Sequence, residues 1–398
     1  MLNRLEKVSV SSMKEAIIAA LKKSKTMRSV LSSVLLVKNF TLTCQTGRSR
    51  RKPKVIQLPI TYKCNSRCVM CNVWKMDYSN EASVGEFSKF LSDPLFDQVA
   101  SVGINGGEPS LIRSLPDYAS EILKLPSIKS LNIISHGFNK KLLLKSIEDI
   151  YASCRAKGVR FHVSISLDGY GETHDRVRGI KGAFSRTMGT IDEIVANRSK
   201  YCDSFDLGCT VVNQNIDHLT TLDNYVRERE LKIKYRLGID NKRIESDQVR
   251  DQYSVIYSPN VQSASEFFHW QYSSAKNLGD KFKYFSLFFW LTASKRKRLL
   301  GCMWKEDGVT LDSRGNLYYC AVASKAIGSL RSGNGQEIFF SDANIQYRQE
   351  LIRENCSSCI HDYGGKAQLV DVVYFIHQHV KRALAMRWYR MRLSIGWI

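Results

Sequence analysis

The alternation of apolar and polar stretches predicts a series of strands, each followed by a helix. Six short runs rich in β-branched and aliphatic residues read as strands: 55–62, 99–105, 130–135, 159–167, 205–212 and 233–239. The segments between them predict helices at 83–91, 115–124, 140–158, 183–197 and 218–230. Strands that alternate regularly with helices are typical of a parallel sheet covered by helices.

This order predicts an α/β fold, and more specifically a partial (β/α)6 TIM-like barrel over residues 55–240. In such barrels the active site lies where the strands end, at their carboxyl ends. Most of the chemically suggestive residues follow the first four predicted strands. We therefore expect a single functional site at that edge of the sheet.

The rest of the chain lacks this alternation. We divide it into a basic helical arm (1–54), a helical connecting region (241–300), a small cysteine-bearing module (301–362) and a basic amphipathic helix (363–398). Within the module, the turn residues 313–316 between short apolar runs predict a hairpin.

Positive charge is concentrated at the two ends of the chain. The formal net charge is +21, and residues 1–63 hold 14 Lys or Arg against two Glu, while residues 380–398 hold five and no acid. The residues between these two ends carry little net charge, so we expect no nucleic acid partner. No apolar run has the roughly 18–20 residues of a membrane span, and no secretory signal precedes the arm. We therefore expect a cytoplasmic protein, with 11 cysteines used for metal or catalysis before disulfides.

The stretch 380–398 mixes its basic residues with Trp388, Tyr389 and Trp397. This composition is typical of an interfacial helix on anionic lipid, which would bring the protein to the periphery of a membrane. It is equally typical of a solvated face, of a helix docked on the protein's own surface, or of one that contacts an acidic peptide or nucleic acid.

Three cysteines, Cys64, Cys68 and Cys71, follow the first predicted strand within eight positions. Structural zinc sites usually gather four protein ligands from two separate segments. Three thiolates on one loop suit a [4Fe-4S] cluster in which one iron keeps an open position. A zinc knuckle and three buried thiols are the alternatives.

Two further motifs join this loop. Residues 105–109 (NGGEP) follow the second strand, and the stretches 164–169 and 174–179 (SISLDG and HDRVRG) lie at and after the fourth. Together with the cysteine loop they resemble the radical S-adenosylmethionine (SAM) superfamily. The resemblance implies that the three cysteines hold a [4Fe-4S] cluster whose open iron binds SAM. It also implies an electron donor such as flavodoxin or ferredoxin, and reductive cleavage of SAM to a 5′-deoxyadenosyl radical that abstracts hydrogen from a substrate C–H bond.

The resemblance also implies a set of SAM contacts: Met70, Gly106, Gly107, Glu108, Ser135, Ser166 and Asp168. Glycines allow close approach of the backbone, a carboxylate accepts hydrogen bonds from the SAM ammonium, and a thioether packs on adenine. Asn105 stands where the family commonly has Thr. A plain turn at the glycines, and capping of the next helix by Ser166 and Asp168, remain alternatives. We expect His136, His162 and His174 to be structural.

A second cysteine set comprises Cys302, Cys320, Cys356 and Cys359. With Gly315 placed before Cys320, it resembles the SPASM/Twitch auxiliary domain, which implies a second, fully ligated [4Fe-4S] cluster in the module. A structural zinc ribbon is the alternative. The isolated Cys44, Cys154, Cys202 and Cys209 are best explained as buried inert thiols.

The sequence therefore predicts a radical SAM enzyme that acts on an unactivated C–H bond of a sugar or small metabolite. One alternative is the same chemistry on a ribosomal peptide, although the arm is shorter than the leader-binding module expected there. The other is a non-catalytic Fe–S or zinc protein that binds nucleic acid or membrane through its basic ends. The sequence names neither the substrate nor the catalytic acid, base or hydrogen donor.

Overall fold

The computed structural model describes the backbone of residues 40–41, 47–361 and 364–394, and side chains within 47–361 and 364–382. The helices predicted in the first 39 residues, and Cys44, lie outside the described residues. Of the basic arm, residues 40–41 and 47–54 are described, and an Arg50–Asp342 ion pair and a Lys52–Asp97 ion pair of 2.9 Å connect it to the body.

The predicted parallel sheet is confirmed. Its six strands are β2 (Val55–Thr61), β3 (Ser101–Gly106), β4 (Ser130–Ser135), β5 (Arg160–Ser166), β6 (Ser204–Val211) and β7 (Ile233–Leu237). They lie in chain order, each parallel to the next. The sheet does not close on itself, because β7 forms one edge and β10 the other. The fold is thus a partial TIM-like barrel, as predicted.

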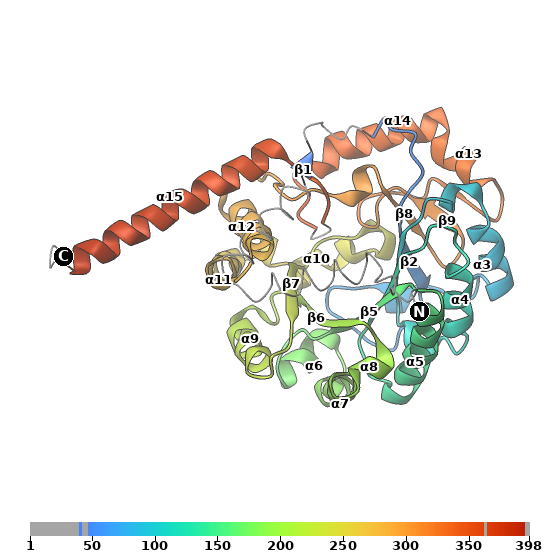
Figure 1. Cartoon of the computed structure of the whole chain (residues 1–398), viewed down its shortest axis with the longest axis horizontal. Helices are drawn as coiled ribbons and strands as arrows, with labels where there is room; N and C mark the ends of the chain where they lie inside the picture. Colours follow the sequence, from blue (N-terminus) through green and yellow to red (C-terminus); the bar gives the residue numbers. More distant parts are fainter. Residues whose placement is uncertain (1–39, 42–46, 362–363, 395–398) are drawn as a thin grey trace, which may run out of the picture.

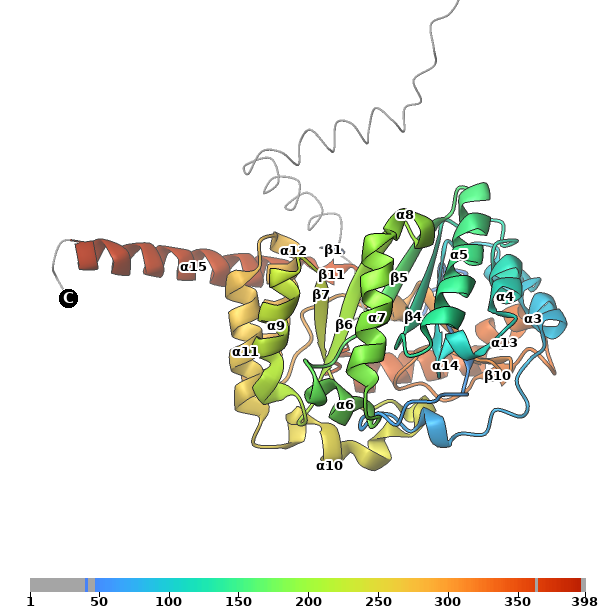
Figure 2. The ribbon, with the colours of Figure 1, turned by 90° about the horizontal axis from the view of Figure 1, so that it is seen from below.

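Helices cover the outside of this sheet (Figures 1 and 2). The predicted ones are α3 (Val84–Leu91), α4 (Leu115–Ile122), α5 (Lys140–Ala156), α7 (Ala183–Ala196) and α9 (Leu219–Glu228). α3 begins at a capping box in which Ser83 Oγ accepts from Glu86 N and Glu86 Oε2 accepts from Ser83 N. The structure adds two short helices that the sequence did not predict, α6 (Glu172–Arg178) and α8 (Arg198–Tyr201).

The two faces of the sheet differ in polarity. Along β3 and β4, alternate residues such as Val102, Ile104 and Leu131 are fully buried against the helices. The residues between them, including Asn105 and Asn132, line the interior cavity of the barrel. Because side chains alternate along a strand, this pattern gives the barrel an apolar outer layer and a polar interior.

The C-terminal module is built onto the barrel sheet. Its predicted hairpin is present as β8 (Gly308–Leu311) and β9 (Asn316–Tyr318), and β10 (Gly328–Ser329) pairs with β9. β8 also pairs in parallel with β2, so the hairpin extends the sheet by three strands. Buried Asp312 in the turn accepts hydrogen bonds from the hydroxyls of Tyr62 and Tyr318. This links the module to the residues that precede the first cysteine loop.

The connecting region is helical, as expected. It contains α10 (Arg250–Tyr253), α11 (Val261–Ser274) and α12 (Leu278–Thr292). The apolar run at 285–293 forms the second half of α12, where Phe285, Leu287 and Trp290 are buried. Among the residues that the structure describes, no helix is long and apolar enough to cross a membrane.

Three more helices complete the chain: α13 (Gly335–Phe340), α14 (Asp342–Leu351) and α15 (Leu369–Ser394). A short parallel pair joins β1 (Phe40–Thr41) to β11 (Ala367–Gln368). The C-terminal helix, predicted within 363–398, is present as α15, which begins at Leu369. Its first turns are anchored by buried Phe375, whose ring lies 5.1 Å from that of Phe282. Its later turns project from the body (Figures 1 and 2).

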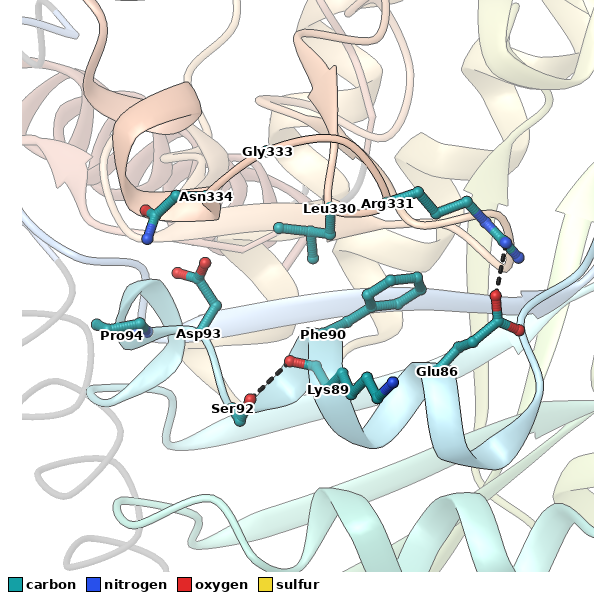
Figure 3. A pocket seen from close by; sticks show the side chains of 10 residues that line it. All are labelled: Glu86, Lys89, Phe90, Ser92, Asp93, Pro94, Leu330, Arg331, Gly333 and Asn334. Atoms are coloured by element: carbon teal, nitrogen blue, oxygen red, sulfur yellow. Dashed lines mark hydrogen bonds and ion pairs between the residues drawn. The ribbon is translucent and has the colours of Figure 1, made fainter.

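A surface cleft of about 510 Å³ lies where the module meets α3 (Figure 3). Arg331 crosses it to pair with Glu86 at 2.6 Å, and Asp93 Oδ2 accepts from Gly335 N at 2.6 Å. The residues that line the cleft include none of the predicted site residues. We therefore interpret it as a packing boundary between module and barrel.

Candidate active site

The three cysteines of the first loop border one cavity of about 180 Å³. The predicted site residues that share its lining are Cys64, Cys68, Cys71, Met70, Gly106, Gly107, Glu108, Ser135 and Ser166. The cavity lies at the carboxyl ends of β3, β4 and β5, where the barrel architecture leads us to expect the site. Of the predicted SAM contacts, Asp168 alone does not line it.

The cysteine loop is held against the end of α6. Val69 N donates to Val177 O at 3.0 Å, and both Arg67 N and Ser66 Oγ donate to Arg178 O, at 2.9 and 3.0 Å. Gly179 closes α6 with φ +65°, and a Cβ there would collide with the carbonyl of Arg67. The backbone of the HDRVRG stretch therefore holds the loop that carries the three cysteines in place.

Arg178 connects this platform to Cys68. Its Nη1 donates to Cys68 Sγ at 3.5 Å, and its Nη2 pairs with Asp168 Oδ2 at 2.6 Å. The other oxygen of fully buried Asp168 accepts from Thr210 N at 2.7 Å. Burial lowers the pKa of Arg178, but the facing Asp168 carboxylate raises it further, so the guanidinium stays charged. Asp168 thus lies behind the cavity wall and orients an arginine that the sequence analysis did not single out.

Glu108 lies in a dense hydrogen-bond network and is 1% exposed. Its Oε1 accepts from Ser110 N at 3.1 Å and from Ser135 Oγ at 2.6 Å, and its Oε2 accepts from His136 N at 3.0 Å. Burial raises the pKa of Glu108, but His136 and the hydrogen bonds outweigh burial and lower it overall. The cavity wall therefore carries a fixed negative charge.

His136 supports this carboxylate as a neutral ring. Burial lowers the pKa of His136 to about 4. Its Nδ1 accepts from Phe138 N at 3.1 Å, which places the ring proton on Nε2, between Asn65 Oδ1 at 2.8 Å and Glu108 Oε2 at 3.2 Å. These contacts fix the imidazole in place and fit the structural role expected for it.

Gly106 and Gly107 bring the GGEP turn against the start of the cysteine loop. Gly106 has φ +126°, and a Cβ on either glycine would collide with the carbonyl of Thr61 or Lys63. The close approach allows Gly107 N to donate to Thr61 O at 2.6 Å and Glu108 N to donate to Lys63 O at 2.8 Å. The two glycines are thus required by contact between two loops as well as by their place in the cavity lining.

Asn105 leaves an unsatisfied acceptor in the lining. Its Oδ1 is buried and has no hydrogen-bond partner among the described residues. Buried polar atoms in folded proteins are nearly always paired, so this oxygen indicates a donor supplied by a ligand. Met70 lies nearby in the lining, and it also borders the larger cavity inside the barrel.

The thiols themselves favour a cationic occupant. Burial raises the pKa of Cys64 and of Cys71 to about 12 each, so alone they would stay protonated at neutral pH. A positively charged iron core replaces those protons and stabilises the thiolates. Within the described ranges, no three His, Cys, Asp or Glu side chains are arranged to hold a single metal ion. The residues around the cavity fit a [4Fe-4S] cluster with SAM.

The second cysteine set also comes together. Cys302, Cys320, Cys356 and Cys359 border a cavity of about 40 Å³. Arg298 connects the segments that form this site. It donates to His361 O at 2.7 Å and to Gly301 O at 3.0 Å, and its Nη1 lies 3.9 Å from Cys359 Sγ. Burial raises the pKa of Cys356 to about 12 and of Cys320 to about 11. As in the first loop, the thiolate forms require a cation.

Arg348 from α14 lines the same small cavity and is 1% exposed. Its Nε, Nη1 and Nη2 have no hydrogen-bond partner among the described residues. Its guanidinium faces the rings of Tyr319 and Phe339, at 4.9 and 5.4 Å from their centres. A buried cation beside four thiols fits an anionic tetrathiolate cluster, which would supply the missing negative charge.

A third cavity, of about 620 Å³, lies inside the barrel. It borders the first site through Met70 and Cys71, and the module through Trp304, Val322 and His361. The last three residues also line the small cavity of the second site. The interior of the barrel therefore extends from one cysteine set to the other.

The other predicted side chains are structural. Cys154, Cys202 and Cys209 are buried thiols, as expected, and burial raises the pKa of Cys154 to about 12. His174 Nδ1 accepts from Asp168 N at 3.0 Å, and His162 Nε2 lies 3.3 Å from Asp206 Oδ1. None of these five lines the cavity of the first cysteine set.

Known proteins support the same assignment. Residues 58–224 match the family model described as the Radical SAM superfamily. The chain is 31% identical over 182 residues to the AdoMet-dependent heme synthase of Methanosarcina barkeri, an alignment that covers 44% of this chain and 48% of that protein. The chain thus spans about half the length of the curated relative it matches.

Two solved structures share the fold at 14% identity each. Native anSMEcpe with bound AdoMet has a TM-score of 0.53, with 83% of this chain and 98% of that chain covered. Streptococcus suis SuiB bound to precursor peptide SuiA has a TM-score of 0.54, with 89% and 76% covered. Together with the cysteine loop and the GGEP turn at the strand ends, the family match and the relative identify residues 58–224 as a radical SAM domain.

Proposed function

We propose that this protein is an enzyme that uses SAM and two iron–sulfur clusters to functionalise a C–H bond. The observation that carries the proposal is the cavity shared by three thiols, the ionised Glu108 and the unpaired Asn105 Oδ1. When bound, the cluster and SAM supply a 5′-deoxyadenosyl radical that abstracts a hydrogen atom from the substrate.

The residues of the chain bind and orient these groups. Cys64, Cys68 and Cys71 would hold three irons and leave the fourth for the amino and carboxylate groups of SAM. Glu108 offers negative charge to the SAM ammonium. Arg178 donates to Cys68 Sγ and so directs one thiolate towards the cavity.

Three more SAM contacts and one positioning residue belong to the proposal. Ser135 Oγ donates to Glu108 and accepts from Gly137 N at 3.0 Å, so one of its two lone pairs remains as an acceptor on the cavity wall. Ser166 lines the cavity beside it and is suited to the carboxylate or ribose of SAM. Met70 supplies a soft surface for adenine. Asp168 would act through Arg178, because its carboxylate pairs with that guanidinium.

The second cysteine set is proposed to hold an auxiliary [4Fe-4S] cluster through all four thiols. Full ligation leaves no open iron, so the cluster would serve electron transfer or structure. An external electron donor such as flavodoxin or ferredoxin would reduce the first cluster. A zinc ion in the module is the competing assignment, and metal analysis of the purified protein distinguishes the two.

The substrate is proposed to bind in the interior cavity next to the first cysteine loop. Its volume of about 620 Å³ lies within the roughly 300–1,000 Å³ typical of small-molecule sites, which favours a sugar or small metabolite. Peptide modification is the second candidate, favoured by the shared fold of SuiB, whose structure was solved with precursor peptide SuiA.

Contact with an anionic membrane surface is a separate part of the proposal. α15 exposes Val370 (66%), Val373 (54%) and Ile376 (44%), and the basic stretch follows in the same helix. Apolar and basic residues on one projecting helix suit adsorption to lipid headgroups. Sedimentation with phosphatidylserine vesicles, but not with phosphatidylcholine vesicles, is expected. Equal recovery with both would contradict it.

Anaerobic reconstitution tests the central proposal. The enzyme should bind roughly eight irons per chain and release 5′-deoxyadenosine from SAM under a strong reductant. A non-catalytic iron–sulfur or zinc protein is the alternative. Bound zinc in place of iron, or full iron without SAM cleavage, would favour that alternative and overturn the proposal.

A further inference from the structure

The interior cavity of the barrel is lined by cations and by no carboxylate. Its charged lining residues are Lys234 and Arg236 of β7 and Arg243, which follows β7. Uncharged polar side chains complete the polar part of the wall: Gln57, Ser101, Asn105, Asn132, Thr210, Asn241 and Ser246, with His361 at the module. No Asp or Glu is among the described residues that border it.

Asp206 and Asp312 already have partners of their own. Asp206 of β6 is buried outside the lining and pairs with Lys234 Nζ at 2.5 Å and with His162 Nε2 at 3.3 Å. It therefore neutralises Lys234. Asp312 in the module turn accepts from Tyr62, Tyr318 and backbone amides of its own turn. Neither carboxylate forms an ion pair with Arg243 in the described part of the chain.

Arg243 has unsatisfied N–H donors in the wall of this cavity. Its Nε and Nη1 are buried without a hydrogen-bond partner among the described residues, although the residue as a whole is only partly buried. The guanidinium lies 5.9 Å from the centre of the Tyr62 ring and forms a side-chain hydrogen bond with Tyr62. A ring face and one hydroxyl compensate a cation only in part, and N–H groups that are buried without an acceptor are costly. Two unsatisfied N–H donors on a planar fork match the oxygens of a phosphate or carboxylate group.

We propose that the substrate is a small molecule that carries a phosphate or carboxylate group, and that Arg243, assisted by Arg236, binds this group inside the barrel. The inference rests on the proposed function, because the same cavity borders Met70 and Cys71 beside the SAM site. The anion would fix one end of the substrate, and so would determine which C–H bond lies next to the 5′ carbon of SAM.

Anion binding to the reconstituted holoenzyme tests this inference directly. The midpoint of thermal unfolding is measured with SAM present, in inorganic phosphate, in succinate and in chloride at matched ionic strength. SAM fills its own site, so its carboxylate does not compete for Arg243. A ligand that binds only the folded state raises the midpoint. A higher midpoint in phosphate than in chloride indicates a substrate that carries a phosphate group. A higher midpoint in succinate than in chloride indicates one that carries a carboxylate. If neither exceeds chloride, the inference is overturned.

Substitutions of single residues test whether the anion that raises the midpoint binds at Arg243. Arg243→Gln should abolish the anion-dependent shift, and Arg243→Lys should retain only part of it, because lysine keeps the charge but loses the fork. Lys242→Gln is the matched control: this neighbouring lysine is exposed and outside the cavity lining, and should keep the full shift. An unchanged shift in Arg243→Gln would overturn the inference. If that variant fails to retain iron, Arg236→Gln is measured instead, and an unchanged shift there has the same consequence.

The two proposals can fail separately. SAM cleavage without any specific anion shift would leave the proposed function intact and remove the anion site. A specific shift that depends on Arg243, in a protein that binds iron but does not cleave SAM, would retain the anion site and contradict the proposed radical chemistry.

Discussion

The two cysteine sites each contain a buried arginine, but only one of these arginines has a carboxylate partner. At the first site, Arg178 pairs with Asp168 at 2.6 Å and donates to Cys68 Sγ. At the second, the three guanidinium nitrogens of Arg348 have no hydrogen-bond partner among the described residues, and two aromatic rings face them. The carboxylates of Glu306 and Asp307 act on this guanidinium through their charge, without an ion pair. The ligands also differ in origin, because one loop supplies the first set, whereas the second is gathered from residues up to 57 positions apart.

This difference indicates how each site balances its charge. The positive charge at the first site is neutralised within the protein, so the fold should persist when the cluster is absent. The second site keeps a buried guanidinium without an ion pair. The charges of Glu306 and Asp307 offset it in part, and an anionic occupant would neutralise it further. We therefore expect the module to depend on its cluster much more than the barrel does.

The largest effect is expected from removal of a ligand at each site. Cys68→Ala should reduce SAM cleavage to background, because two thiolates cannot hold a cluster with one open iron. Cys356→Ala should lose roughly half of the iron while reducing 5′-deoxyadenosine formation far less. Iron content and product formation are measured on the same preparations.

Cys154→Ala is the matched control, since this buried thiol of α5 borders neither cysteine cavity. It should keep both the iron and the SAM cleavage of the parent. Persistent SAM cleavage in Cys68→Ala would show that the first site has been assigned to the wrong cysteines.

Asp168→Asn should be the most destabilising substitution at the first site. It leaves the Arg178 guanidinium buried without its carboxylate, a change that typically costs about 3–5 kcal/mol. Denaturant unfolding of the iron-free protein measures the loss. Asp192→Asn removes an exposed partner of Arg229 and should change stability by less than about 1 kcal/mol. Equal losses of stability in Asp168→Asn and Asp192→Asn would mean that the buried ion pair contributes no more to stability than an exposed one.

Arg348→Met should have opposite effects on the two forms of the protein, stabilising the cluster-free form and weakening the hold on iron in the cluster-bound form. Without a cluster it removes an unpaired buried charge and should stabilise the module, by on the order of 3 kcal/mol. With the cluster bound it removes the compensating cation, so iron should be lost faster to a chelator. Arg353→Met, on an exposed neighbour, should do neither. Destabilisation of the iron-free form by Arg348→Met would contradict the comparison of the two sites.

Local patterns explain why the barrel and the first loop could be predicted. Each strand is a short apolar run, and Cys64, Cys68 and Cys71 are consecutive ligands whose meaning does not depend on the rest of the fold. The capping box at Ser83 is similarly local. These features are encoded within about ten residues, the range over which sequence patterns are most informative.

Long-range contacts account for what could not be predicted. Arg178 reaches Cys68 across 110 positions, and β8 pairs with β2 across about 250. The orphan nitrogens of Arg348 exist only because α14 packs against the module. Nothing in the residue types distinguishes Arg178 or Arg348 from an exposed arginine, since pairing and burial arise when distant segments meet.

The smallest expected effect is a pH dependence to which His136 of the first site contributes, beside His174, whose pKa burial also lowers. Burial lowers the pKa of His136 to about 4, against roughly 6.5 in an unfolded chain. Between these values the unfolded state binds a proton that the native state does not, so stability falls as the pH falls through this window. The loss should reach about 2–3 kcal/mol near pH 4 and then level off for this group. His136→Gln should flatten the slope of unfolding free energy against pH, whereas His377→Gln, on the exposed part of α15, should leave the slope unchanged. If His136→Gln retains the slope, the titrating group lies elsewhere, and the neutral ring beside Glu108 is not what makes the first site acid-sensitive.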